Sequence, residues 1–432
     1  MTLLVISPDY ASHVLPLATL ATAWRRAGDR VVFATGPATH SVVTAFGYER
    51  CDLSLGRGSN PGVIRVEQQQ PGEDEALRGF FEATRRGMVE TLRYQADARG
   101  SDLLWEPVAR AGEVLRIVDR VRPDHVLVDH LAFSARLGLT TAGVPYGDVV
   151  LGHPTALPVG AEVYGYPVSW PAAFRPEPDA LAALHERCRA VRDEFTDRWN
   201  AAAAALGSAQ TVPDAFAAHG DAVLLNYPAL LHDPARTAML PFGHTFLGSA
   251  VRDEKAPADV RRWLDVDSRD PVVYVSLGSF LSARGDVLAR LVEALRPLPV
   301  RVALAAGSTD PGSLGDVPPT WLLREHLPQV AVLRRAAVAV THGGNNSVTE
   351  ALACGVPMVL LPFSTDQFAG AAAVERSGLG EALDPNAAGP AELRGAVGRV
   401  LTGDGRLAAQ ALAGMLRAHP GPELARAAVP PA

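Results

Sequence analysis

Short, uninterrupted apolar runs recur along this chain, and they constrain its fold more than any other feature. The runs at residues 3–7 (Leu-Leu-Val-Ile-Ser) and 272–276 (Val-Val-Tyr-Val-Ser) are typical of strands that are covered on both faces. After the first run, residues 13–27 carry apolar side chains at helical spacing, and this pattern stops at Gly28. The chain therefore begins with a strand and a helix, as a parallel sheet does, and a similar strand opens its second half.

Further apolar runs predict the remaining strands. They lie at residues 31–34, 125–128 and 222–225, and again at 302–305, 330–333, 337–340 and 358–361. Strands that alternate with helices on this scale predict an α/β fold of two doubly wound, Rossmann-like domains. We expect an N-terminal domain over residues 1–240, a C-terminal domain over 241–410, and a helix or tail over 411–432 that packs back on the N-terminal domain. Residues 247–257, charged and with Gly and Pro, suit a linker.

Composition excludes several function classes. The 432 residues carry 40 Lys and Arg against 47 Asp and Glu, and the arginines fall in scattered pairs, so no nucleic-acid footprint is visible. Lys255 is the single lysine, which excludes a Walker A loop. The three cysteines are too far apart for a metal site or a disulfide framework, which favours the cytoplasm. No apolar run approaches the ~20 residues of a membrane anchor.

The richest stretch for chemistry is residues 341–350, Thr-His-Gly-Gly-Asn-Asn-Ser-Val-Thr-Glu. A buried strand ends at Val340, two glycines permit a tight turn, and a helix is expected to start near Ser347. The free N–H groups of such a helix start form an anion site, to which the side chains of His342, Asn346 and Ser347 could add donors. The alternative is that Ser347 and Glu350 merely form a capping box.

Over residues 327–367 the sequence resembles the donor-binding signature of the family 1 glycosyltransferases, which use nucleotide-diphosphate sugars and have the GT-B fold of two facing Rossmann-like domains. The resemblance includes the bacterial enzymes that glycosylate macrolides and other natural products. The matching positions, at the spacings of that signature, are Pro328, Gln329, His342, Gly344, Asn346, Ser347, Glu350, residues 355–358 (Gly-Val-Pro-Met), Asp366 and Gln367.

The resemblance implies a role for each position on the donor side. His342 would bind the diphosphate with Asn346 and Ser347, and Glu350 would accept hydrogen bonds from the ribose hydroxyls. Leu327 would hold the nucleobase through its backbone, and Asp366 and Gln367 would bind the sugar hydroxyls. The donor-binding residues expected in addition are Gly278, Ser279, Gln329 and Gly344, with Gly278 and Ser279 giving a second phosphate contact.

Two donor-side positions depart from the family pattern. His326 stands where many relatives have a Trp that stacks on the base, and Asn345 stands where another Trp is usual. We therefore expect weak discrimination between uracil and thymine, and an altered contact of Asn345 with the outer edge of the sugar.

The resemblance places the catalytic pair in the N-terminal half. His13 follows the first strand and would remove the acceptor's proton, although Ser12 replaces the usual Gly before it. Asp129, at the end of another strand, would fix the tautomer of His13 and stabilise its cation. Both positions lie where open parallel sheets bind ligands. Tyr164, Tyr166 and Trp170 either line an acceptor pocket or belong to a loop that roofs the sheet; no role is assigned to His40, His125, His130 and His153.

The resemblance implies an inverting, metal-independent hexosyltransferase. It would move a hexose or deoxyhexose from a UDP- or TDP-sugar to a hydroxyl of a small lipophilic acceptor of polyketide or antibiotic type, without a further cofactor. The preference for Arg over Lys, with abundant Ala, Gly and Pro, is typical of a high-GC bacterium. Two alternatives remain open: a non-catalytic, glycosyltransferase-like activator, against which the presence of both His13 and Asp129 argues, and a nucleotide-sugar epimerase. Asp265 and Asp267, an Asp-x-Asp pattern, are expected in a solvated turn.

Overall fold

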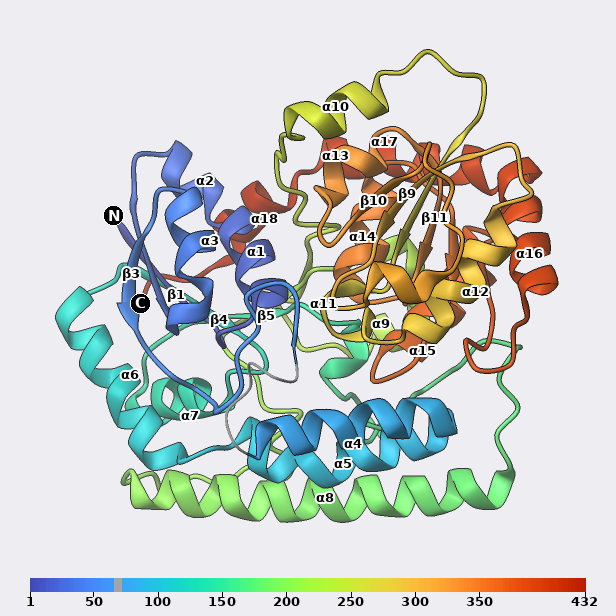
Figure 1. The fold of residues 1–432 in the computed structure, drawn as a ribbon. Coiled ribbons are helices and arrows are strands. Elements are labelled where there is room, and N and C mark those ends of the chain that lie inside the picture. The colour runs from blue at the N-terminus through green and yellow to red at the C-terminus, as the bar shows by residue number, and fades with distance from the viewer. Residues whose placement is uncertain (66–71) are drawn as a thin grey trace.

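Two parallel sheets, one in each half of the chain, organise the computed structural model (Figure 1). The structure describes residues 1–65 and 72–432. Within these residues the strand order is β3-β2-β1-β4-β5-β6-β7 in the N-terminal sheet and β10-β9-β8-β11-β12-β13 in the C-terminal sheet. The central strands are buried on both faces, as their unbroken apolar runs require. The prediction of two doubly wound α/β domains is confirmed.

The strands are short, as is usual for such sheets. The N-terminal sheet contains β1 (Thr2–Ile6), β2 (Arg30–Thr35), β3 (Glu49–Asp52), β4 (His125–Asp129), β5 (Gly147–Val150), β6 (Ala222–Leu225) and β7 (Thr245–Phe246). The C-terminal sheet contains β8 (Val272–Ser276), β9 (Arg301–Ala305), β10 (Leu322–Arg324), β11 (Ala336–Thr341), β12 (Met358–Leu360) and β13 (Gly380–Ala382).

Helices cover both sheets. Those of the N-terminal half are α1 (Ala11–Leu20), α2 (Thr22–Arg26), α3 (His40–Ala45), α4 (Glu73–Arg86), α5 (Met88–Leu103), α6 (Pro107–Val121), α7 (Phe133–Ala142), α8 (Pro178–Ala205) and α9 (Pro234–Thr237). The others are α10 (Ala258–Leu264), α11 (Gly278–Leu281), α12 (Gly285–Leu295), α13 (Gln329–Leu333), α14 (Asn345–Ala353), α15 (Gln367–Arg376), α16 (Pro390–Thr402), α17 (Gly405–Ala418) and α18 (Gly421–Ala428).

One predicted strand is wrong. Residues 330–333 form most of helix α13 rather than a strand. Pro328 precedes the helix, and its carbonyl accepts from the N–H of Val332 at 3.0 Å. The Glu254 carboxylate accepts from the N–H of Val330 at 2.8 Å and so satisfies one donor of the first turn. A run of four apolar residues fits a buried helical turn as well as a strand, and only these long-range partners decide between them.

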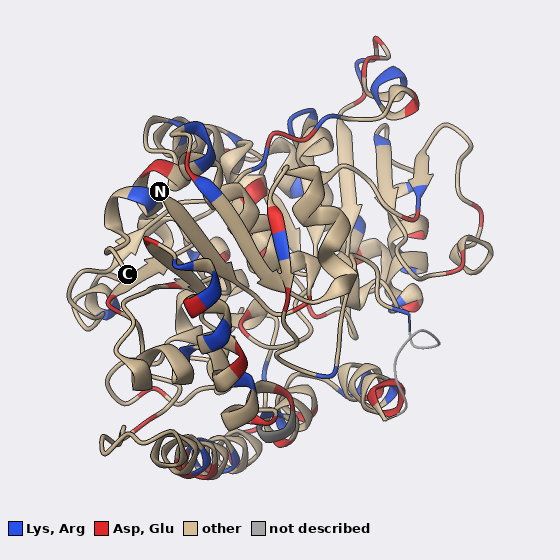
Figure 2. Cartoon of the chain, turned by 90° about the vertical axis from the view of Figure 1, so that its left-hand side faces the viewer, with Lys and Arg blue, Asp and Glu red and all other residues tan. Residues whose placement is uncertain are grey.

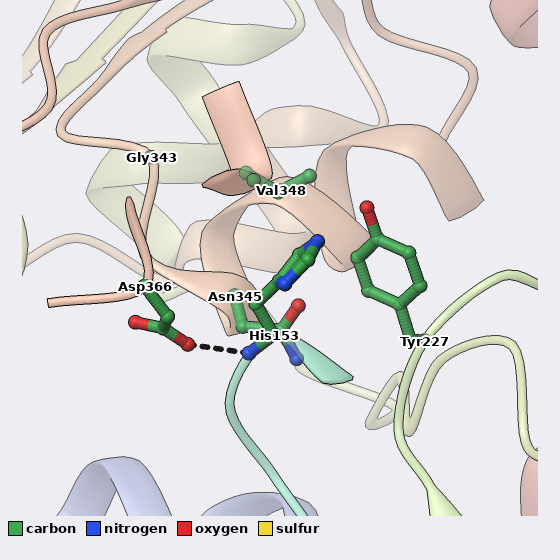
Figure 3. Close-up of a pocket in the computed structure, with 7 residues that line it drawn as sticks. His153, Tyr227, Gly343, Asn345, Val348 and Asp366 are labelled. Carbon is green, nitrogen blue, oxygen red and sulfur yellow. Dashed lines mark hydrogen bonds between the residues drawn. The ribbon is translucent and has the colours of Figure 1, made fainter. Parts of the chain in front are cut away.

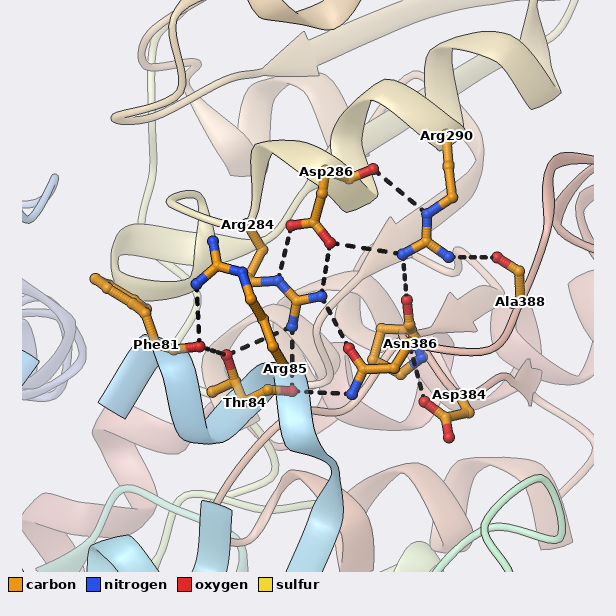
Figure 4. Close-up of polar contacts among 10 residues, drawn as sticks. Phe81, Thr84, Arg85, Arg284, Asp286, Arg290, Asp384, Asn386 and Ala388 are labelled. Carbon is orange, nitrogen blue, oxygen red and sulfur yellow. Dashed lines mark hydrogen bonds and ion pairs between the residues drawn. The ribbon is translucent and has the colours of Figure 1, made fainter. Parts of the chain in front are cut away.

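Helices α4, α5 and α8 form a layer along one side of the molecule, beneath both sheets in the view of Figure 1. The end of α4 docks on the C-terminal domain through Arg284, which is buried (Figure 4). Arg284 bonds the Asp286 carboxylate at 2.8 and 2.7 Å and donates to the Thr84 carbonyl at 3.2 Å. The Asn386 amide donates to the same carbonyl at 2.9 Å. This layer therefore ties the two domains together.

The end of the chain returns to the N-terminal domain. Ala425 and Val429 pack in the core that contains Leu3 and Trp24, and the N–H of Ala432 donates to the Asp124 carbonyl at 2.7 Å. By contrast α17 packs on the C-terminal domain, so the return begins with α18.

Figure 2 shows basic and acidic residues interspersed on the side that it displays.

Candidate active site

A cavity of about 1090 Å³ lies between the carboxyl edges of the two sheets. Every predicted site residue except Trp170 lines it. Trp170 packs instead against an apolar cluster that includes residues of α5 and α8. Tyr164 and Tyr166 do line the cavity, with Tyr164 stacked on Phe216 at a centroid distance of 4.2 Å. The fold thus gathers residues from both domains around one space.

His13 and Asp129 are in direct contact. The His13 Nδ1 lies 2.6 Å from Oδ2 of Asp129, whose other oxygen accepts from the N–H of Leu131 at 2.9 Å. The two side chains meet because β1 and β4 are parallel neighbours, which puts the loop after β1 beside the end of β4. With Nδ1 donating to the carboxylate, Nε2 is left as a free base.

The pKa of His13 reflects opposing effects. Burial lowers it, but the charge and hydrogen bond of Asp129, assisted by the charge of Asp366, raise it above its ordinary value. The imidazole is therefore a stronger base than burial alone would leave, and the imidazolium that forms on protonation has a partner in place.

His342 lies at the turn after β11, between two glycines. A Cβ on Gly278, which has φ +74°, would come 2.5 Å from the ring, and a Cβ on Gly344 would come 2.3 Å from its Nε2. A side chain at either position would clash with the imidazole, so glycine at both positions is what allows the ring to lie there. Burial lowers the pKa of His342 to about 4, so the imidazole is neutral at pH 7 and offers an anion one N–H rather than a charge.

Helix α14 begins earlier than expected. It starts at Asn345 with Gly344 at the N-cap, rather than near Ser347. Ser347 thus lies inside the first turn and Glu350 beyond it, so the capping-box alternative is wrong. The amides of this first turn have no partners within the helix, and Ser347 lines the cavity, as an anion site requires.

The two asparagines at the start of α14 face the N-terminal domain. The amide of Asn345 donates to the carbonyls of Leu151 at 2.7 Å and Asn226 at 2.9 Å. The amide of Asn346 donates to the Ser12 carbonyl at 2.6 Å, immediately before His13. Their predicted donor contacts stay predictions; what the structure displays is a link between the helix start and the loop of His13.

Glu350 is buried, and both of its oxygens already have partners. Arg252 Nη1 donates at 2.5 Å and Gln329 Nε2 at 2.7 Å, while the Tyr274 hydroxyl donates to the Gln329 oxygen at 3.2 Å. Burial raises the pKa of Glu350, and Arg252 opposes that rise. The lone pairs left on the carboxylate are those available to a ribose. Sequence reasoning missed Arg252, because nothing marks it among the charges of the linker.

Asp366 lies where the two domains meet (Figure 3). Its carboxylate accepts from the N–H of His153, and Thr365 donates to its other oxygen at 3.0 Å. The Thr365 backbone has a φ of +50°, and its N–H donates to Gln95 of α5 at 3.1 Å. His153, for which no role was expected, is buried beside Tyr227. Burial, with help from nearby Arg236, lowers the pKa of His153 to about 3.

The side chain of Gln367 holds its own loop. Its oxygen accepts from the N–H groups of Phe363 and Ser364, at 3.0 and 3.2 Å, and its nitrogen donates to the Ser364 hydroxyl at 3.1 Å. One N–H is therefore left for the predicted contact with a sugar.

The base-side residues line the rim of the cavity. His326 is exposed after β10, and Leu327 beside it is buried.

Asp265 forms an ion pair with Arg335 at 3.0 Å on the surface, away from the cavity residues. Over residues 1–65 and 72–432, no group of three His, Cys, Asp or Glu side chains could hold a metal ion. No helix in the part of the chain that the structure describes is long and apolar enough to cross a membrane.

Comparison with known proteins agrees with this geometry. Residues 185–420 match the family described as UDP-glucoronosyl and UDP-glucosyl transferase. The chain is 38% identical over 167 residues to an NDP-glycosyltransferase YjiC of Bacillus licheniformis, covering 37% of this chain and 42% of that protein. It is 34% identical over 165 residues to the demethyllactenocin mycarosyltransferase of Streptomyces fradiae, covering 38% of this chain and 36% of that protein.

The matched segments thus span about two fifths of these curated relatives. Similarity of fold extends much further. The crystal structure of the glycotransferase of kitacinnamycin superposes with a TM-score of 0.67 at 24% identity, covering 99% of this chain and 97% of the other. The GT-B arrangement is therefore present throughout.

Proposed function

Because the chain belongs to the UDP-glucoronosyl and UDP-glucosyl transferase family, we propose that it transfers a hexose or deoxyhexose from a UDP- or TDP-sugar to a hydroxyl of a small lipophilic acceptor. The observation that carries this proposal is that the His13–Asp129 pair and the turn of His342 line the same cavity from opposite domains. An acceptor held by the first domain can thus meet a donor held by the second.

The proposed chemistry is one inverting displacement. The Nε2 of His13 takes the proton of the acceptor hydroxyl as its oxygen attacks the anomeric carbon, and Asp129 stabilises the imidazolium that forms. The bond between the anomeric carbon and the diphosphate oxygen breaks, and the diphosphate leaves with its electron pair. Attack from the His13 side and departure towards α14 require inversion at that carbon.

The leaving diphosphate would be stabilised by the start of α14. First-turn amides and the helix dipole favour negative charge there, and neutral His342 adds one N–H donor. Glu350, held by Arg252 and Gln329, would orient the ribose. We propose that these groups suffice for turnover without a metal ion or further cofactor.

We base the proposed class of acceptor on the similarity of this chain to named glycosyltransferases and on the volume of the cavity. The mycarosyltransferase relative is named for demethyllactenocin, and the similar solved structure is named for kitacinnamycin. A volume of about 1090 Å³ leaves room for a multi-ring aglycone beside a nucleotide sugar. A natural product of this size is the acceptor that we propose.

A donor and acceptor screen tests the proposal. The purified chain is incubated with UDP- and TDP-sugars and a panel of hydroxylated polyketide aglycones, and products are identified by mass spectrometry and their anomeric configuration by NMR. We expect glycosides of inverted configuration, and at least a 10²-fold loss of rate in His13→Ala. His40→Ala, which changes an exposed histidine, is the matched control. Sugar epimerisation without an acceptor, or retained configuration, would contradict the proposal.

A further inference from the structure

Arg99, on the acceptor side of the cavity, has no carboxylate partner among the residues that the structure describes. It projects from α5, and its guanidinium carbon lies 5.2 Å from the centre of the Tyr164 ring. Its Nε is buried and makes no hydrogen bond to any residue that the structure describes. Other arginines of the same helical layer are paired: Arg93 with Glu90 at 3.5 Å and Arg187 with Asp97 at 2.6 Å. A partly buried cation without a counter-ion is costly, so this one requires an explanation.

Arg99 shares the cavity with the catalytic pair. The hydroxyl of Tyr164 feels several charges at once: burial raises its pKa, Arg99 opposes that rise, and Asp366 and Asp129 add to it. Tyr164 is therefore close enough to Arg99 and to both carboxylates to feel their charges. Arg99, Tyr164 and His13 all line the cavity, so an acceptor held there beside His13 has Arg99 in the same space.

We propose that Arg99 binds an anionic oxygen of the acceptor, a carboxylate or an ionised phenol or enol, and so fixes which hydroxyl faces His13. This rests on the proposed function of the cavity. A guanidinium offers two parallel N–H donors that match a carboxylate, and stacking on Tyr164 holds its plane. Asp129 and Asp366 repel an anion placed near them, so the acceptor has one favourable orientation.

A matched pair of probes tests the proposal on the full chain. 6-Hydroxy-2-naphthoic acid and its methyl ester differ in the negative charge, and their binding is measured by calorimetry. The unmodified protein should bind the acid at least about tenfold more tightly than the ester. Arg99→Met should weaken binding of the acid by about ten- to a hundredfold and leave the ester unchanged. Arg99→Lys, which keeps the charge but loses the paired donors, should fall between.

Arg93→Met is the matched control, because it removes a cation from the same helix outside the cavity. Equal binding of acid and ester, no binding of either, or an equal loss in Arg93→Met would overturn the proposal. If Arg99→Met does not fold, the ratio of the binding affinities for the acid and the ester in Arg99→Lys is the deciding measurement. UDP and TDP binding, measured on the same samples, should not change in Arg99→Met; absence of nucleotide binding in the unmodified protein would instead contradict the proposed function.

Discussion

Replacement of Asp129 by Asn is the sharpest test of the catalytic pair, because it keeps the shape of the side chain and removes its charge. In the structure the carboxylate is buried, 2.6 Å from the His13 Nδ1 and held by the N–H of Leu131. The imidazolium that forms during transfer would lose a hydrogen bond to a charged group, and such bonds contribute about 1.5–3 kcal/mol. At about 1.4 kcal/mol for each factor of ten, kcat should fall about 10- to 150-fold.

The pH dependence gives an independent readout of the same variant. His13 must be neutral to accept a proton, so kcat/KM should rise with pH through the pKa of His13, which Asp129 holds above the ordinary 6.5. In Asp129→Asn the lowering effect of burial is no longer offset by that charge, so the acidic limb should move to lower pH while the plateau falls. Initial rates measured between about pH 5 and 9 show both effects. An unmoved limb, or a loss of less than about threefold in kcat, would refute the assignment of the pair.

Four further outcomes are expected. Glu350→Gln should bind UDP more weakly by calorimetry, since it offers the ribose an uncharged acceptor and loses the ion pair with Arg252; unchanged affinity would contradict that role. Arg252→Met should make UDP affinity rise with pH. Without Arg252, burial raises the pKa of Glu350 further, so Glu350 is protonated as the pH falls and loses the charge that binds the ribose; a pH-independent affinity would count against the pair. Product formation should persist in excess EDTA, and an absolute need for a divalent ion would rule out the proposed role of α14. UDP and TDP should bind within about tenfold of each other, with His326→Trp tightening both by up to ~1 kcal/mol through stacking; a hundredfold preference in the unmodified protein would show that another residue distinguishes the bases.

Much of the donor side could be predicted because it is local in the chain. A buried strand, a glycine turn and a helix start follow one another from Val340 onward, and each depends on residues that are neighbours in sequence. Where local patterns were ambiguous, the prediction was wrong. The strand expected at residues 330–333 is a helix, and α14 begins at Asn345 rather than near Ser347.

The residues that sequence reasoning missed share one property: their partners are distant in the chain. Arg252 meets Glu350 across 98 positions, and Gln95 meets Thr365 across 270. Neither lies in a motif, and no periodicity singles it out. Arg99 likewise differs from the many other arginines only by its place in the fold, because its lack of an acidic partner among the described residues is a property of packing.

By itself the sequence determined the two parallel sheets and the residues at the carboxyl ends of their strands, since periodicity and glycine turns act within a few residues. Only the tertiary structure decided which of those residues touch. His13 and Asp129 lie 116 positions apart and meet because β1 and β4 pair. The two asparagines of α14 reach across to the other domain, and Glu350 accepts from the linker, because those contacts depend on how the domains close together. Strand pairing and domain packing follow from the burial of whole surfaces, which no short stretch of sequence records.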